Sequence, residues 1–187
     1  MGSVKGPSSP EDYRSAHFLV HTDLAAKDAR KLLDRLEVML GLISKYWGQP
    51  PTGTIECYVV DDLHNWPAGS LPPAGLTKVR ERAGITMVET MNQGPRTLAA
   101  KAVVVAVTEN GTPQHEAVHA YCGQTFGKTG PLWYAEGMAE VGQYWRQNDT
   151  SVHCHPHIIK YLRSTPAKPL PRYWPKTARR GRVSRKP

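Results

Sequence analysis

Hydrophobic residues between positions 24 and 47 recur at intervals of three and four. Six of them share this spacing: Leu32, Leu33, Leu36, Leu40, Ile43 and Trp47. Such spacing places side chains on one face of a helix. Thr22 or Asp23 before the stretch and Gly48 after it are residue types that begin and end helices. The pattern therefore predicts a long amphipathic helix over residues 24–47.

Four other stretches are rich in β-branched or apolar residues and are bounded by turn-forming residues, which is typical of strands. They cover residues 16–20, 54–60, 84–88 and 101–108. The last of them reads KAVVVAVT and has the strongest β character in the chain. Residues 61–82 contain several prolines and glycines, so we expect them to be irregular.

Two further helices are predicted over residues 113–122 and 132–145, and a short one over residues 157–163. Together with the strands, this order predicts an α/β (α+β) fold. A small mixed, twisted sheet would be backed by the long helix and followed by two antiparallel helices.

The 187 residues suit one domain, which we expect to span residues 15–165, after a disordered N-terminus at 1–14. Residues 166–187 are expected to be a flexible basic tail. Seven Lys and Arg and no acid lie in residues 172–187, so the formal charge of +8 falls to about +1 for the rest. Because no nucleic-acid reader motif accompanies the tail, we expect no nucleic-acid partner.

No apolar stretch approaches the roughly 20 residues that a membrane helix needs, so we expect no membrane contact. The N-terminus lacks the apolar segment of a signal peptide. The expected location is therefore cytoplasmic by default, or outside the cell if a leader has been removed. The sequence does not specify the oligomeric state.

The motif His115-Glu116-Ala117-Val118-His119 is the strongest chemical feature of the chain. Residues four apart lie on one helix face, so both imidazoles can point at one metal ion. Glu116, one step round the helix, can instead reach a water bound to that ion. A bare HExxH also arises by chance on surface helices, so a metal site needs support from the residues C-terminal to the motif.

A catalytic zinc site needs a third protein ligand and an open position for water. The metzincin pattern would place a histidine six residues after His119, where this chain has Thr125. The alternative is a glutamate from the next helix. Glu136 lies 17 residues after His119, which leaves room for the chain to turn and return antiparallel.

HEAVH followed by PLWYAEGMAE resembles the gluzincin clan of thermolysin-like zinc peptidases, and in particular the short peptidase MA-like proteins. The resemblance is specific over about residues 112–145. It implies a zincin-like fold and one zinc ion bound by His115, His119 and Glu136, with Glu116 as general base and acid. It also implies that Glu140 supports the first histidine; the alternative is that Glu140 is a solvated helix residue.

The activity implied is zinc-dependent hydrolysis of a peptide or protein substrate. The alternative is a catalytically weak or inactive zincin-fold module that binds peptides. In the resembling family a strand beside the HExxH helix aligns the substrate. Residues 101–108 either take that place or form a simple buried strand.

A further donor is needed for the oxyanion, and several residues after the second helix remain candidates: Tyr144, His153, His155, His157 and Tyr161. The run HCHPH at residues 153–157 can be read as a second metal site. We favour a loop that leads into a helix.

Overall fold

The computed structural model describes residues 9–166, apart from residues 95, 128–129, 147, 150–152 and 155. The chain divides into two compact units, Met1–His153 and Cys154–Pro187, and each is described by itself. The described residues of the second unit contain one helix. Of the predicted basic tail, residues 167–187 lie outside the described residues.

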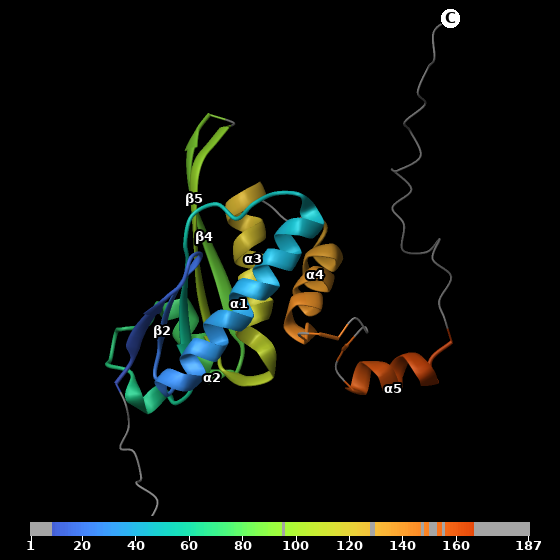
Figure 1. The fold of residues 1–187 in the computed structure, drawn as a ribbon, viewed down its shortest axis with the longest axis horizontal. Helices are drawn as coiled ribbons and strands as arrows, with labels where there is room; N and C mark the ends of the chain where they lie inside the picture. Colours follow the sequence, from blue (N-terminus) through green and yellow to red (C-terminus); the bar gives the residue numbers. More distant parts are fainter. Residues whose placement is uncertain are drawn as a thin grey trace, which may run out of the picture. The chain divides into compact units, whose positions relative to one another are not determined.

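The first unit is built on one five-stranded mixed sheet with the strand order β1-β2-β3-β5-β4 (Figure 1). The three inner strands, β2, β3 and β5, run parallel, and the two edge strands pair antiparallel to their neighbours. The strands are β1 (Glu11–Arg14), β2 (Phe18–Thr22), β3 (Ile55–Val60), β4 (Gly84–Gln93) and β5 (Arg96–Val107).

Helices cover both faces of this sheet. They are α1 (Ala26–Trp47), α2 (Pro73–Arg80), α3 (Thr112–Phe126) and α4 (Leu132–Tyr144), with the short 3₁₀ turns η1 (Leu63–Asn65) and η2 (Glu109–Gly111). The helix of the second unit is α5 (Pro156–Ser164). None of the described helices combines the length and the apolar character needed to cross a membrane. The predicted mixed α/β class is confirmed.

Two hydrophobic cores lie on opposite faces of the sheet, because alternate residues of a strand point to opposite sides. On one face, Val104 and Ala106 of β5 pack with α1, α3 and α4. On the other face, Val105 and Val107 pack with Trp66 and with α2. The larger first core supports the two helices that carry the predicted site.

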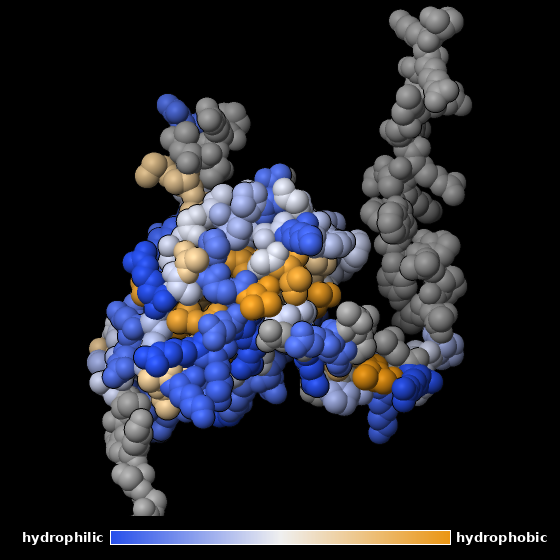
Figure 2. All heavy atoms as spheres, viewed as in Figure 1, coloured by the Kyte–Doolittle hydropathy of each residue, from blue (hydrophilic) through white to orange (hydrophobic). Residues whose placement is uncertain are grey.

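The long helix predicted from the apolar spacing is confirmed as α1, which ends at Gly48 in the left-handed conformation (φ 68°). The stripe it buries is Ala29, Leu32, Leu33, Leu36, Met39, Leu40 and Ile43. Exposed Val38 and Leu42 lie on another side of α1, and Figure 2 shows hydrophobic surface in the region of α1 and α4. Most of the predicted apolar face is nevertheless turned to the sheet.

The predicted start of α1 is wrong, because Thr22 and Asp23 do not cap it. The helix begins after Ala25, without a side-chain cap. Thr22 instead accepts a hydrogen bond from the N–H of Leu24. The preceding strand is also displaced by two residues, to Phe18–Thr22, because Phe18, Val20 and Thr22 are its buried positions.

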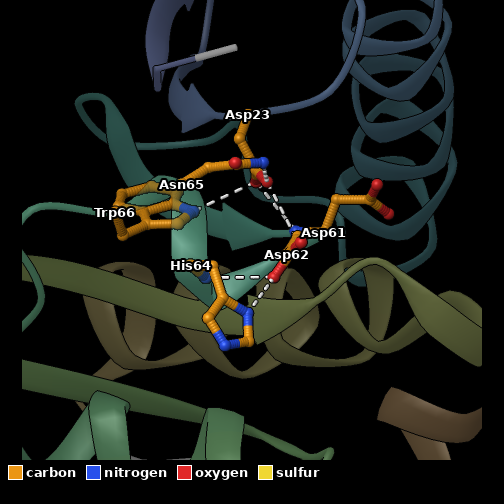
Figure 3. Close-up of polar contacts among 6 residues, drawn as sticks. All are labelled: Asp23, Asp61, Asp62, His64, Asn65 and Trp66. Carbon is orange, nitrogen blue, oxygen red and sulfur yellow. Dashed lines mark hydrogen bonds and ion pairs between the residues drawn. The ribbon is translucent and has the colours of Figure 1, made fainter. Parts of the chain in front are cut away.

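The Asp23 carboxylate ties the end of β2 to the turn that follows β3 (Figure 3). The side chain of Asn65, the indole of Trp66 and the backbone N–H groups of Asp61 and Asp62 all donate hydrogen bonds to it, over 2.8–3.0 Å. Burial raises the pKa of Asp23, but the hydrogen bonds together lower it further, so the net pKa lies below the usual range. Asp23 is thus a structural anchor.

Two regions differ from the sequence predictions in secondary structure. Glu11–Arg14, inside the segment predicted to be disordered, forms β1 because its backbone pairs with β2 and Tyr13 packs against the core. Residues 61–82, predicted irregular, contain α2. Pro73 stands at the start of that helix, where a missing N–H costs nothing, and Val79 is buried against the sheet.

The hairpin of β4 and β5 is longer than predicted, because pairing between the strands continues beyond residues 84–88 and 101–108. β5 also lies inside the sheet, paired with β3 on one side and β4 on the other. It therefore cannot be the edge strand that aligns a substrate, and the interpretation as a buried strand is the correct one. The edge strand beside α3 is β4.

Candidate metal centre

Helix α3 presents the HExxH motif. It follows two left-handed residues, Asn110 and Gly111, and ends at the left-handed Gly127. The sequence placed its end at Cys122, before Gly123, but Gly123 is helical and buried. Close packing requires glycine at position 123, because a Cβ there would lie 2.5 Å from a methyl group of Val88 on β4. α3 can thereby approach the edge strand closely.

Helix α4 packs along α3 in the opposite direction. Gln114 near the start of α3 donates a hydrogen bond to the carbonyl of Gly142 near the end of α4. His119, one turn further along α3, lies beside Glu136, nearer the start of α4. The loop between the helices therefore returns the chain as the sequence predicted, and Glu136 is brought to both histidines.

The side-chain atoms of His115, His119 and Glu136 converge on one point. The two Nε2 atoms are 3.2 Å apart, and Glu136 Oε2 lies 3.4 Å from Nε2 of His115 and 3.6 Å from that of His119. Zinc bonds of about 2.0–2.2 Å in tetrahedral geometry put neighbouring ligand atoms roughly 3.3–3.6 Å apart. The three residues therefore fit a zinc ion, with a fourth position left for water or substrate.

The hydrogen-bond partner of His115 also suits a metal ligand. Gln143 on α4 donates through Nε2 to the carbonyl of Asn110, so its Oε1 faces His115 Nδ1 at 3.0 Å. Because that oxygen can only accept, Nδ1 is the donor in this contact, and Nε2 is the ring nitrogen that faces the centre. The orientation of His115 is thus fixed by α4.

The carboxylate expected to support the first histidine was Glu140. The structure places Glu140 Oε1 3.9 Å from His115 Nδ1, which is an ion-pair contact but too long for a hydrogen bond. Gln143 makes the hydrogen bond instead, and the sequence reasoning missed it. Its position seven residues after Glu136, two helical turns along the same face, is the pattern that identifies it.

Glu116 lies beside the three converging residues and is only 8% exposed. Its Oε2 accepts a hydrogen bond from the hydroxyl of Thr86 on β4 over 2.8 Å. Gly84, two residues earlier on β4, lies against the Glu116 side chain, and a Cβ there would be 2.7 Å from Glu116 Cγ. The edge strand therefore restricts the position of the predicted general base. The motif alone does not reveal these contacts between β4 and Glu116.

These groups open into one cleft of about 420 Å³ between α3, α4 and β4. Its lining comprises Gly84, Ile85, Thr86, Val88, His115, Glu116, His119, Gly123, Gly127 and Glu136. Within the described part of the chain, no other set of three or more His, Cys, Asp or Glu side chains brings its ligand atoms together. The cleft thus combines a candidate metal site, a carboxylate and a strand edge that no described strand pairs with.

Of the residues considered as oxyanion donors, Tyr144 and His153 belong to the first unit, and neither lines this cleft. Tyr144 ends α4, and His153 contacts Asp149 over 2.7 Å. His157 and Tyr161 lie on α5 in the second unit. His155 lies outside the described residues, so the interpretation of residues 153–157 as a metal site or a loop stays a prediction.

Replacing Gln143 by leucine should weaken zinc binding about 10- to 100-fold, because His115 loses the partner that fixes its ring. Glu140→Gln is the matched comparison on the same helix and should weaken binding less. Competition with a chromogenic chelator measures both affinities. A larger loss for Glu140→Gln than for Gln143→Leu would show that the carboxylate, and not the amide, supports His115.

The chain matches no protein-family model, and no curated protein matches it.

Proposed function

We propose that this protein is a zinc-dependent peptidase of the gluzincin type. The observation that carries the proposal is the triangle of 3.2, 3.4 and 3.6 Å formed by the ligand atoms of His115, His119 and Glu136. Glu116 adds a second carboxylate to the same cleft. It lies on α3 with the two histidines but is not one of the three residues of the triangle. Two neutral imidazoles and one carboxylate are the ligand set of many hydrolytic zinc sites.

Zinc bound here would supply a Lewis acid for the substrate carbonyl and would lower the pKa of a water molecule toward about 7. The chain's own part in the reaction falls first to Glu116. Its carboxylate takes a proton from the water as the water oxygen bonds to the peptide carbon. It then gives that proton to the departing nitrogen when the C–N bond breaks.

Substrate alignment is assigned to β4. Among the described strands, β4 pairs only with β5, so the backbone groups on its other side are available to an extended peptide. A peptide added to this edge would gain main-chain hydrogen bonds and lie across the cleft. This supports a peptide as the substrate class, since other ligands make less use of a strand edge.

A module that binds peptides without cleaving them is the second candidate. The observation in its favour is that, among the described residues of the first unit, His115 and His119 are the only His or Tyr side chains that line the cleft. A dedicated oxyanion donor contributes about 2.7–4 kcal/mol in other hydrolases. Turnover of an unstructured protein such as casein, followed with and without a chelator, separates the two candidates.

Metal analysis tests the centre directly. The parent chain should contain one zinc per molecule, and both His119→Ala and Glu136→Ala should lose most of it, because two ligands no longer enclose the ion. His64→Ala is the matched control, since that histidine lies exposed on η1 beside Asp62. Full zinc content in His119→Ala, measured after dialysis against a weak chelator, would contradict the proposed ligand set.

A further inference from the structure

The hydroxyl of Thr86 bridges the edge strand and the predicted general base. Its Oγ1 lies 2.8 Å from Glu116 Oε2 and also 2.8 Å from the main-chain oxygen of Glu116. Thr86 is half-buried in the cleft wall. Gly84, Thr86 and Val88 are alternate residues of β4, so their side chains share the face of the strand that lies against α3.

The two oxygens of the Glu116 carboxylate therefore have different surroundings. Oε2 is bound by Thr86, whereas no hydrogen bond to Oε1 is found among the described residues. Oε1 lies over Gly84, where an added Cβ would be 3.0 Å from it. One oxygen is thus anchored to β4, and the other is left uncovered by the absence of a side chain at position 84.

We propose that Thr86 is a positioning residue for Glu116, an inference that rests on the proposed peptidase function. Its hydroxyl holds Oε2, so that the free Oε1 is the atom that exchanges the proton with water and with the leaving nitrogen. Without this bond, the side chain can rotate about its torsions and the carboxylate spends less time in the reactive position. Small displacements of catalytic groups carry large rate costs.

A hydroxyl suits this role because its single hydrogen has two acceptors in reach. When Glu116 is ionised, the charged Oε2 is the stronger acceptor. When Glu116 carries the transferred proton on Oε1, Thr86 can still donate to Oε2 or to the main-chain oxygen. Thr86 therefore keeps a hydrogen-bond acceptor on Glu116 through both halves of the reaction, and no proton leaves Thr86.

The competing explanation is that Thr86 only packs β4 against α3. Two substitutions separate the explanations, because they remove different parts of the side chain. Thr86→Val keeps the branched shape and the strand preference and removes the hydroxyl. Thr86→Ser keeps the hydroxyl and removes the methyl group. Positioning requires the hydroxyl, whereas packing requires the shape.

Peptide hydrolysis by the full zinc-loaded chain is the first measurement. Thr86→Val should lower kcat about 10- to 100-fold, the loss expected for a hydrogen bond to a charged group, with little change in KM. Thr86→Ser should stay close to the parent. Thr77→Val, the same substitution on α2 outside the cleft lining, is the control and should leave both constants unchanged.

A second measurement does not depend on activity. Zinc content should be the same in Thr86→Val, Thr86→Ser and the parent. All three should be fully folded at the assay temperature, although Thr86→Val should melt at a lower temperature because it loses one hydrogen bond. With cobalt in place of zinc, the visible absorption spectrum reports on the groups around the metal. Thr86→Val should shift this spectrum in the same direction as Glu116→Gln, and Thr86→Ser should leave it unshifted.

The outcomes distinguish this role from the function on which it rests. A parent chain that binds zinc and cleaves no peptide would overturn both. An active parent with an inactive Glu116→Gln and a fully active Thr86→Val would overturn the role of Thr86 alone. Greater loss in Thr86→Ser than in Thr86→Val would also overturn it, in favour of packing.

Discussion

Glu116→Gln should bind one zinc per chain, as we expect of the parent, and lose about 10²- to 10⁴-fold in kcat, the contribution typical of general acid–base catalysis. Glutamine has the size of glutamate, and its amide oxygen can still accept the hydrogen bond from Thr86. An amide cannot take a proton from water near neutral pH. The substitution therefore removes the chemistry and preserves the shape of the cleft.

A matched carboxylate outside the cleft tests whether this result is specific to Glu116. Glu89 is an exposed residue of β4, opposite Lys101 of β5 and on the sheet face turned away from α3. Glu89→Gln changes the net charge by the same amount and should leave kcat unchanged. Peptide turnover by Glu116→Gln at the parental rate, with zinc bound, would rule out Glu116 as the base.

The sequence predicts well those features that repeat locally. The apolar spacing in α1 and the motif on α3 both depend on residues within one or two helical turns, where helical geometry relates positions directly. The number of residues between His119 and Glu136 gave one longer-range prediction. In the structure, Nε2 of His119 and Oε2 of Glu136 lie 3.6 Å apart. The α/β class follows from the same local patterns in order.

Contacts between distant segments were not predictable in this way. Thr86 and Glu116 are 30 residues apart, and which residues of β4 lie against α3 depends on where the strand enters the sheet. Gln143 was missed for a different reason. Glu140 has the charge expected of a supporting group, and only the packing of α4 on η2 and α3 shows that the amide lies closer.

β1 illustrates why edge strands escape prediction. Its sequence, EDYR, has no apolar alternation, because an edge strand with little burial can be polar. It is held by backbone pairing with β2, by Tyr13 against the core and by contacts such as Asp12 with His21 at 2.6 Å. None of these partners is adjacent in sequence, so composition alone indicated disorder.

Asp23→Ala should lower the free energy of unfolding by about 3–5 kcal/mol. Asp23 is 5% exposed and accepts at least four hydrogen bonds, two of them from backbone N–H groups that lose this acceptor in the variant. Hydrogen bonds to a charged group contribute about 1.5–3 kcal/mol each, and such contributions are not additive. Asp34→Ala, at an exposed position of α1, is the control and should change stability by less than about 0.5 kcal/mol.

The effect should depend on pH with a definite sign. The pKa of Asp23 in the folded chain lies below its usual value, so folding favours the ionised form. Its contribution is therefore complete above the unfolded pKa of about 3.9 and is lost as the pH falls through the lower folded value. Urea unfolding of the parent and of Asp23→Ala at pH 7 and pH 3 measures this, and the difference between the two chains should narrow at pH 3. If the difference in free energy of unfolding between the parent and Asp23→Ala were the same at pH 7 and pH 3, the side chain would stabilise the fold by packing and not by its charge.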